Sequence, residues 1–269
     1  MMAQFKNVME VYKLLDKSNC LKCGSKTCLA FAAAVFTGQK QLGECPKVPE
    51  EFIPKDSKSG PSGLAARDGN AFMDDLKARI AKIDLAEAAK RLGADFSSGR
   101  LTVKVLGKDY GVDEKGNIFT DIHVNPWVAV PFLVYVLHGQ GLIPTGNWVS
   151  FRELKDGIDH YPLFKKRCED VLKQIADVYT DLFDDMVHMF GGKPVAPQFQ
   201  SDVSVVLHPL PLVPVMICYR LPEDGLPSSL HVFFDETADK NLDNQCIFTI
   251  GAGLAHMFSK FAARHGFVV

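Results

Sequence analysis

The 269-residue sequence predicts an α+β protein in which a small helical domain is linked to a larger domain of mixed helices and antiparallel sheet. Four of the seven cysteines lie close together before residue 46. The stretch Lys55–Gly63 is rich in glycine, serine and charged residues, as linkers are. Beyond it, helical and strand patterns alternate without the regular strand–helix–strand order of a parallel sheet. We therefore expect a small domain over residues 1–53, a linker over 54–66 and a body over 67–269.

The clustered cysteines have the spacing of ligands to one metal centre, C-x2-C-x4-C-x16-C, at Cys20, Cys23, Cys28 and Cys45. Three ligands in one loop followed by a distant Cys-Pro pair are typical of an iron–sulfur cluster, which predicts a [4Fe-4S] centre. Zinc sites usually combine two C-x2-C pairs, and only one such pair is present here. A zinc site, a disulfide and an unliganded set of thiols are the alternatives that the spacing leaves open.

Two short helices are predicted around these cysteines. Thr27 is a suitable N-cap for a helix over Cys28–Phe36, and Gly38 can end that helix. Cys28 then lies in the first turn, where free N–H groups and the positive end of the helix dipole stabilise a negatively charged centre. Apolar residues at helical spacing predict an earlier helix over residues 5–15, which we expect to cover the cluster.

The cysteines belong to two longer motifs, N-C-x2-C-G-x3-C-L-A-F over Asn19–Phe31 and G-x3-L-x2-C-P over Gly38–Pro46. Together they resemble the small iron–sulfur domain of the large subunit of the corrinoid iron–sulfur protein, the methyl carrier of the acetyl-CoA pathway. The resemblance covers residues 5–50 and implies that the four cysteines bind a [4Fe-4S] cluster. Related domains occur in electron-transport subunits, so the motif indicates a low-potential electron carrier more specifically than a corrinoid protein.

The composition indicates an ordinary globular protein, with 47% hydrophobic residues, 23% charged residues and a formal net charge of −2. We expect no nucleic-acid partner, no signal peptide and no membrane span, since the longest apolar run, Trp127–Leu137, is too short. The scattered Cys168, Cys218 and Cys246, with an oxygen-sensitive cluster, indicate a reducing cytoplasm. Residues 1–50 contain seven lysines and four acidic residues. This positive charge would favour docking on an acidic redox partner, or it simply forms a face exposed to solvent.

The body is predicted to combine helices with antiparallel strands. Helices are expected over residues 68–92, 126–138, 161–190 and 254–264, and strands over 101–105, 110–112, 118–119, 203–207, 213–219 and 230–234. Short turns separate the first three strands and suggest a meander. His208–Pro214 contains three prolines, which remove donors from a strand ladder, so we expect no regular central strand there.

One block of the body is a candidate pocket. Gly146–Glu153 reads G-x-W-x-x-F-R-E, and its Trp148 and Arg152 could line a ligand site, or Trp148 could anchor a loop to the core. This block, the proline-spaced strand and Phe233-Phe234-Asp235 resemble a domain of unknown function that follows the same cluster motif in proteins of anaerobes. That resemblance implies no reaction.

Histidines are the candidate ligands for a cobamide or another tetrapyrrole. His208 is favoured, because the following prolines would hold it rigidly at the end of a strand. His123 lies in a sequence that resembles the D-x-H-x-x-G signature of proteins that bind cobamides through a histidine, although a turn before a helix explains it better. Further candidates are His231, His256 and His265, for which a structural role is the commoner alternative.

The segment Gly251–His256 contains two glycines in the spacing that opens a dinucleotide-binding fingerprint. Its third glycine position is His256, and the chain continues for too few residues to complete a strand–helix–strand unit. We therefore reject dinucleotide binding at this segment.

Three functions fit these observations. The first is a redox protein whose cluster passes single electrons to a corrinoid or another tetrapyrrole, held by the body or by a partner protein. The second is a module that binds a ligand or a partner and uses the cluster structurally. The third is a reductase with its site around Trp148, Arg152 and His208, for which no residue pattern specifies a substrate.

Overall fold

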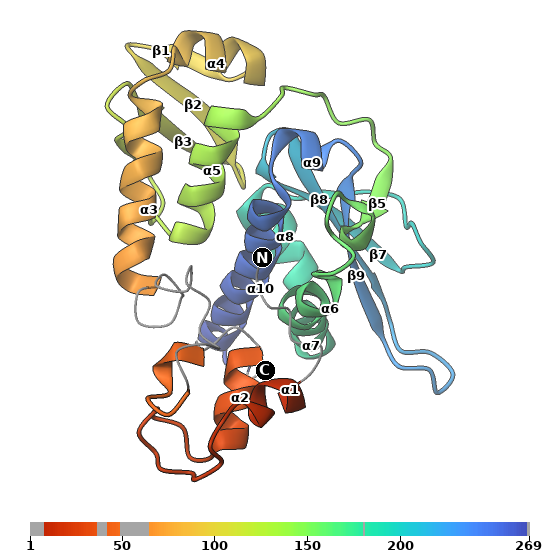
Figure 1. Cartoon of the computed structure of the whole chain (residues 1–269). Coiled ribbons are helices and arrows are strands. Elements are labelled where there is room, and N and C mark those ends of the chain that lie inside the picture. The colour runs from red at the N-terminus through yellow and green to blue at the C-terminus, as the bar shows by residue number, and fades with distance from the viewer. Residues whose placement is uncertain (1–7, 37–41, 49–64, 180, 268–269) are drawn as a thin grey trace. The chain divides into compact units, whose positions relative to one another are not determined.

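The computed structural model describes residues 8–36, 42–48, 65–179 and 181–267 (Figure 1). The chain forms two compact units, Met1–Met73 and Asp74–Val269. Helices and two antiparallel sheets together confirm the predicted α+β class. The predicted linker over 54–66 lies outside the described residues, apart from its last two residues, which begin helix α3 (Ala65–Ile80).

The first unit contains two helices around a small core. Helix α1 (Val8–Lys13) packs against α2 (Cys28–Phe36), and a short 3-10 helix, Leu42–Glu44, precedes the last cysteine. The predicted N-cap is confirmed, because Oγ1 of Thr27 accepts the N–H of Ala30 at 3.0 Å. The core consists of Val11, Leu15, Cys28, Phe31, Ala32, Leu42, Cys45 and Val48. Gly38, which was expected to end the second helix, and the first three residues of the helix expected over 5–15 lie outside the described residues.

Two helices occupy a stretch for which one helix was predicted. The single helix expected over 68–92 is wrong, because α3 ends at Ile80 and α4 (Leu85–Leu92) starts anew. Asp84 causes the restart, since its side chain accepts the N–H groups of Ala86 and Glu87 at 2.8 and 3.1 Å. Gly93 ends α4 in the left-handed region, as expected for a C-terminal glycine.

A four-stranded antiparallel meander follows, in the order β1-β2-β3-β4. Its strands are β1 (Asp95–Ser97), β2 (Arg100–Val105), β3 (Lys108–Asp113) and β4 (Ile118–Thr120). The predicted meander is therefore confirmed, with β1 as an additional strand. The apolar side chains of β2 and β3 face the core, while alternate residues of β2 are exposed.

A five-stranded antiparallel sheet has the order β5-β9-β8-β7-β6. Its strands are β5 (Trp148–Ser150), β6 (Lys193–Pro194), β7 (Val203–Leu210), β8 (Val213–Arg220) and β9 (Ser229–Asp235). No regular strand was expected over His208–Pro214, and this is wrong for the first residues of that stretch, because β7 runs through Pro209. The β7–β8 register shifts between Leu207 and Leu210, which leaves Pro209 outside the paired residues.

The remaining helices pack around α10 (Asn244–Arg264), which is longer than predicted because Asp243 caps it. Helix α5 (Pro126–His138) confirms its prediction. The single helix expected over 161–190 is instead α6 (Tyr161–Phe164), a π-helical segment (Lys165–Glu169), α7 (Asp170–Val178) and α8 (Leu182–Phe190). The interruption before α8 arises at Tyr179, whose backbone is extended. A short helix, α9 (Ala238–Asn241), precedes α10.

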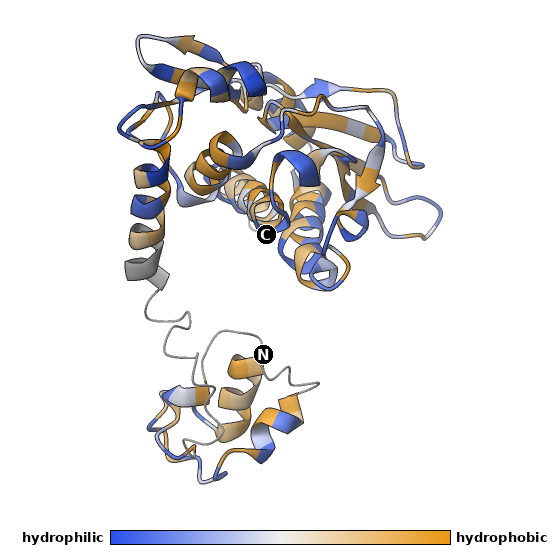
Figure 2. Cartoon of the chain, turned by 45° about the horizontal axis from the view of Figure 1, so that its top comes forward, coloured by the Kyte–Doolittle hydropathy of each residue, from blue (hydrophilic) through white to orange (hydrophobic). Residues whose placement is uncertain are grey.

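Helix α10 lies between α5 and α7 in the core of the second unit (Figure 1). Apolar residues are concentrated on α5, α10 and the strands of the larger sheet (Figure 2). By length and composition α10 could cross a bilayer, but half of its most apolar window is buried within the protein, as in core helices of soluble proteins.

Candidate functional site

The loop between α1 and α2 presents three of the cysteines. Asn19, Leu21 and Gly24 all have positive φ angles, of 48°, 62° and 70°. The N–H of Gly24 donates to the carbonyl of Leu21 at 2.9 Å and closes a tight turn between Cys20 and Cys23. Left-handed residues in such a turn gather backbone N–H groups into concavities that bind anions. The loop is therefore built to surround a negatively charged group.

Asn19 ties this loop to the start of α2. Its side-chain Oδ1 accepts the N–H of Cys28 at 2.7 Å, and its own N–H donates to Cys28 Sγ at 3.3 Å. Cys28 is the first residue of α2, so its sulfur also lies at the positive end of the helix dipole. A hydrogen bond and a helix dipole placed in this way are features of sites that hold a negatively charged centre.

The four thiols differ in exposure. Cys28 and Cys45 are buried, whereas Cys20 and Cys23 are half-buried, and none of these four described residues forms a disulfide. The backbone N–H of Lys22, followed by the Ser18 side chain, lowers the pKa of Cys20 below its ordinary value. The donor set is thus four soft sulfur ligands with an apolar inner side and a more open outer side.

The thiols of the described residues do not form a ready-made site for a single metal ion. Among the described residues, no three His, Cys, Asp or Glu side chains converge as ligands to one ion. A zinc site would require sulfur atoms about 2.3 Å from a common metal. An iron–sulfur cluster distributes its thiolate ligands over several iron atoms, so it accommodates sulfurs that do not meet at one point.

In the second unit, the block around Trp148 has a structural explanation. Its N-terminal Gly146 donates a backbone N–H to the buried Asp235 at 2.7 Å, and Trp148 pairs with Asp235 in the β5–β9 ladder. The Trp148 ring packs on a buried group formed by Val206, Met216 and Cys218. Trp148 therefore anchors its strand to the larger sheet.

Arg152, His208 and His265 make different contacts in the second unit. The exposed Arg152 places its guanidinium 5.8 Å from the centre of the Tyr161 ring. The carbonyl of His208 accepts the N–H of Leu106 at 2.9 Å and so links the two sheets. Burial, followed by the charge of Lys193, lowers the pKa of His208. His265 lies against Phe261, with ring centres 4.5 Å apart.

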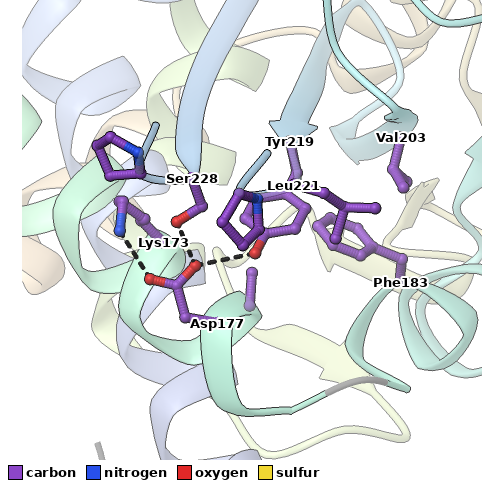
Figure 3. A pocket seen from close by; sticks show the side chains of 10 residues that line it. Lys173, Asp177, Phe183, Val203, Tyr219, Leu221 and Ser228 are labelled. Carbon is purple, nitrogen blue, oxygen red and sulfur yellow. Dashed lines mark hydrogen bonds and ion pairs between the residues drawn. The ribbon is translucent and has the colours of Figure 1, made fainter. Parts of the chain in front are cut away.

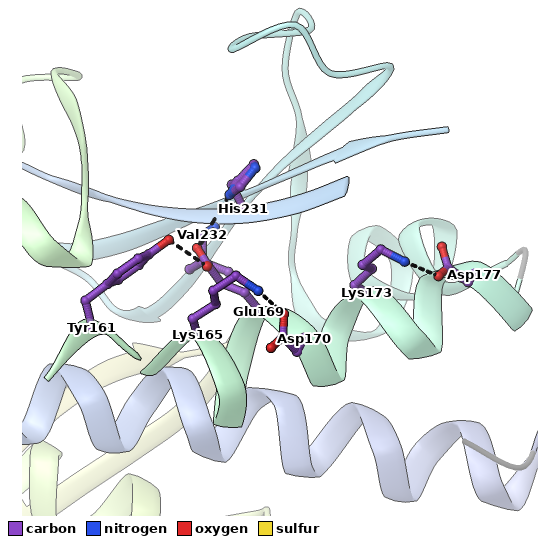
Figure 4. A network of polar contacts seen from close by, with 8 residues as sticks. All are labelled: Tyr161, Lys165, Glu169, Asp170, Lys173, Asp177, His231 and Val232. Carbon is purple, nitrogen blue, oxygen red and sulfur yellow. Dashed lines mark hydrogen bonds and ion pairs between the residues drawn. The ribbon is translucent and has the colours of Figure 1, made fainter. Parts of the chain in front are cut away.

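A buried carboxyl group, which sequence reasoning missed, lies at Glu169 at the end of the π-helical segment (Figure 4). Its oxygens accept the Val232 N–H at 3.0 Å and the Tyr161 hydroxyl at 3.1 Å, and His231 Nδ1 lies 3.9 Å away. Burial raises the pKa of Glu169 above its ordinary value. Its spacing from the buried Leu172 and Ala176 is helical, which is a signal that could have placed it on the core face.

A cavity of about 690 Å³ opens beside Asp177, between α7 and the ends of β7, β8 and β9 (Figure 3). Asp177 Oδ1 accepts the hydroxyls of Tyr219 at 2.8 Å and Ser228 at 2.5 Å, while Lys173 Nζ lies 2.7 Å from Oδ2. Because three donors already satisfy this carboxylate, it holds α7 to the sheet and is poorly placed to bind a further group.

A second cavity, of about 520 Å³, lies between the start of α5, the end of α8 and the C-terminal half of α10. It receives two of the predicted histidines, His123 and His256, while Trp148, Arg152 and His208 line neither this cavity nor the one beside Asp177. Its other lining residues are Asn125, Trp127, Phe190, Met257, Lys260, Phe261 and Arg264. Sequence reasoning missed this combination, because the elements that form it are distant in the chain.

Comparisons with known protein families match both parts of the chain. The family described as "Domain of unknown function (DUF3786)" matches residues 84–257, and the family described as "Putative Fe-S cluster" matches residues 15–47. The second match covers all four clustered cysteines, so the N-terminal cysteine region is an Fe–S cluster domain. No solved structure matches the chain significantly.

Two further relatives match this chain over short stretches. The acetyl-CoA decarbonylase/synthase complex subunit gamma of Methanopyrus kandleri is 43% identical over 54 residues, which is 20% of this chain and 12% of that protein. The corrinoid/iron-sulfur protein large subunit of Moorella thermoacetica is 50% identical over 40 residues, or 15% of this chain and 9% of that protein. The chain therefore shares with these relatives a short domain and little of their remaining length.

Proposed function

Because this chain belongs to the DUF3786 family and has an Fe–S cluster domain ahead of that region, we propose that it is an electron-transfer protein. Its [4Fe-4S] cluster would deliver single electrons to a corrinoid or another tetrapyrrole, held by the body or by a partner protein. The names of the relatives support this acceptor, since one is a corrinoid/iron-sulfur protein and the others belong to an acetyl-CoA decarbonylase/synthase complex. All seven cysteines lie in the described part of the chain and none forms a disulfide, which fits a reducing compartment such as the cytoplasm.

The residues assigned to the cluster are Cys20, Cys23, Cys28 and Cys45. When bound, the cluster supplies reversible one-electron transfer. The chain contributes the surroundings that tune such a centre: the Asn19 N–H donates to Cys28 Sγ, and the dipole of α2 favours negative charge at the same sulfur. Phe31 and Leu42 exclude water from the inner side.

The exposure of the loop is the observation that favours electron transfer over a purely structural role. Cys20 and Cys23 are only half-buried, and Leu21 between them is 62% exposed. A redox partner could therefore approach this edge of the site, and the apolar Leu21 side chain would contribute to the contact. A centre that only stabilised the fold would not require an open edge.

The proposal is tested by anaerobic reconstitution of the full chain with iron and sulfide, followed by stepwise reduction monitored by visible absorption and electron paramagnetic resonance. We expect reversible reduction by one electron per chain in the wild type and in Cys246→Ser, which changes a cysteine outside the cluster set. Cys20→Ser is expected to lose this signal or to shift its potential.

The acceptor is tested on the same reconstituted protein by titration with a cobamide. Reduction of the cobalt at a rate that depends on the cluster, and that falls in Cys20→Ser, is expected. If the cluster resists reversible reduction while its loss unfolds the N-terminal region, the structural role is correct and the electron-transfer proposal is wrong. If the cluster is reduced but leaves the cobalt unchanged, the corrinoid acceptor is wrong.

A further inference from the structure

The cavity between α5, α8 and α10 combines aromatic faces with positive charge. Trp127, Phe190 and Phe261 supply the aromatic faces, whereas Lys260 and Arg264 supply the charge. None of the described residues that line it is an aspartate or a glutamate. Within the described part of the chain, neither Lys260 nor Arg264 is engaged in an ion pair. Its charge is therefore available to a ligand.

Three basic residues lie on one side of α10. His256, Lys260 and Arg264 follow one another at intervals of four residues, so they share a helix face. Two neighbouring like charges at this spacing repel each other and slightly destabilise the helix. The dipole of α10 stabilises a cation in the last turn, such as Arg264, but it does not explain basic residues further from the C-terminal end. A bound anion would explain why all three basic residues share this face.

The start of α5 adds to the positive potential. Asn125 precedes the helix, but its side chain donates to the carbonyl of His123 at 3.3 Å and does not cap the helix. The partial positive charge at the N-terminal end of α5 therefore has no side-chain acceptor at the cap position.

The aromatic wall is built by a close approach between two helices. A Cβ atom on Gly253 would lie 2.3 Å from two carbon atoms of the Trp127 ring, which shows that the indole rests directly on the backbone of α10. Gly253 belongs to the Gly251–His256 segment that mimics a dinucleotide fingerprint. Its actual role is to admit Trp127, whose ring then forms one side of the cavity.

From these observations we propose that the cavity binds a planar aromatic ligand carrying a carboxylate or phosphate group. The rings of Trp127, Phe190 and Phe261 would pack against the planar body, and Lys260 and Arg264 would pair with the anionic group. The volume of about 520 Å³ lies within the range of small-molecule sites. This proposal goes beyond the electron-transfer function and does not depend on it, since every residue involved lies in the second unit.

A pair of fluorescent probes isolates the role of charge: anilinonaphthalene sulfonate and its neutral parent, phenylnaphthylamine, share the same rings. We expect the full-length chain to bind the sulfonate up to about fivefold more tightly than the neutral probe, the gain typical of a pair formed with an exposed charge such as Lys260 or Arg264. Lys260→Gln combined with Arg264→Gln should abolish that difference. Lys90→Gln combined with Lys108→Gln removes the same charge from exposed positions elsewhere and should preserve it.

The site of binding is located by energy transfer from tryptophan to the probe. The chain has two tryptophans, so Trp127→Phe should remove most of the transfer, while Trp148→Phe should retain it. Equal affinity of the wild type for the two probes would overturn the proposal. So would an equal loss of sulfonate affinity in the Lys260/Arg264 and Lys90/Lys108 double variants, or energy transfer that depends on Trp148. None of these results bears on the cluster, because the measurement requires no reduction.

Discussion

The backbone N–H of Val232 donates to Glu169 Oε1 at 3.0 Å, immediately beyond the last residue pair of strands β5 and β9. Strand β5 ends at Ser150, which pairs with Phe233. The carboxyl group of Glu169 therefore accepts the first N–H of β9 beyond the part that pairs with β5. Glu169 is only 2% exposed, and burial raises its pKa. The folded protein therefore holds a proton on Glu169 more tightly than the unfolded chain does.

This relationship predicts how stability depends on pH. Because the folded-state pKa of Glu169 is raised, its contribution is fully present below the ordinary glutamate pKa and is lost as pH rises through the folded value. Glu169→Gln mimics the protonated form, so it should match the wild type in acid and exceed its stability at higher pH. The divergence should reach at most about 1.4 kcal/mol per pH unit within that window. Urea denaturation at a series of pH values measures it.

The matched control for Glu169→Gln is Glu114→Gln, which removes a carboxylate from an exposed turn. Its stability should remain parallel to the wild type over the whole pH range. A Glu169→Gln variant that is less stable than the wild type at neutral pH would show that the buried carboxylate is ionised and stabilising.

Asp177 is expected to show the opposite dependence. Burial opposes its ionisation, but hydrogen bonds from Lys173, Ser228 and Tyr219 outweigh burial and lower its pKa. Its contribution is therefore present above the ordinary aspartate pKa and is lost as pH falls through the lowered folded value. Asp177→Asn should cost about 1–3 kcal/mol at neutral pH, in keeping with hydrogen bonds to a charged group. The difference should shrink on acidification.

The comparison variant for Asp177 is Asp109→Asn, which breaks an exposed ion pair with Lys104. Exposed pairs are worth about 0–1 kcal/mol, so this change should be nearly neutral. Equal losses in the two variants would mean that the contacts of Asp177 with Tyr219 and Ser228 do not stabilise the fold. Both losses are measured by denaturant unfolding at neutral pH.

The parts of this protein that the sequence predicts are those determined by neighbouring residues. Thr27 and Gly93 act as caps through hydrogen bonds and backbone angles set within a few residues, and the cap at Thr27 was predicted correctly. The cysteine spacing likewise identifies an Fe–S cluster domain, because its loop is a local structure. Strands of the meander follow from alternating side chains and short turns.

The failures involve contacts between segments far apart in the chain. The apolar periodicity continued across Asp84, so a single helix was expected where a side-chain cap divides two. His208 and Trp148 were joined into one hypothetical pocket, yet β7 and β5 lie on opposite sides of the β8–β9 pair. The cavity beside Trp127 depends on the packing of α5 against α10, which no local pattern encodes.

The contact between Gly253 and Trp127 predicts an unusual effect of a helix-favouring substitution. Alanine is about 1 kcal/mol better than glycine in a helix interior, so Gly253→Ala would stabilise an open position. Here the added methyl group would overlap the Trp127 ring, and overpacking typically costs about 1–3 kcal/mol. We therefore expect net destabilisation and a shift in tryptophan fluorescence. The control variant Ala252→Gly, one residue away, measures the difference in helix propensity between alanine and glycine alone. A Gly253→Ala variant more stable than the wild type would contradict the observed packing.

Removal of the fourth cysteine separates the cluster from the rest of the fold. Cys45 is buried in the core of the first unit, next to Phe31 and Leu42, and returns to the site after a separate turn. Cys45→Ser should therefore lower iron per chain and loosen this small core, since a unit of this size depends on its metal centre for stability. Cys246→Ser, at the start of α10, should retain the iron. Iron analysis and limited proteolysis test this prediction. Full iron content in Cys45→Ser would exclude Cys45 as a ligand. Loss of protease resistance confined to the first unit would show that the DUF3786 region folds without the cluster.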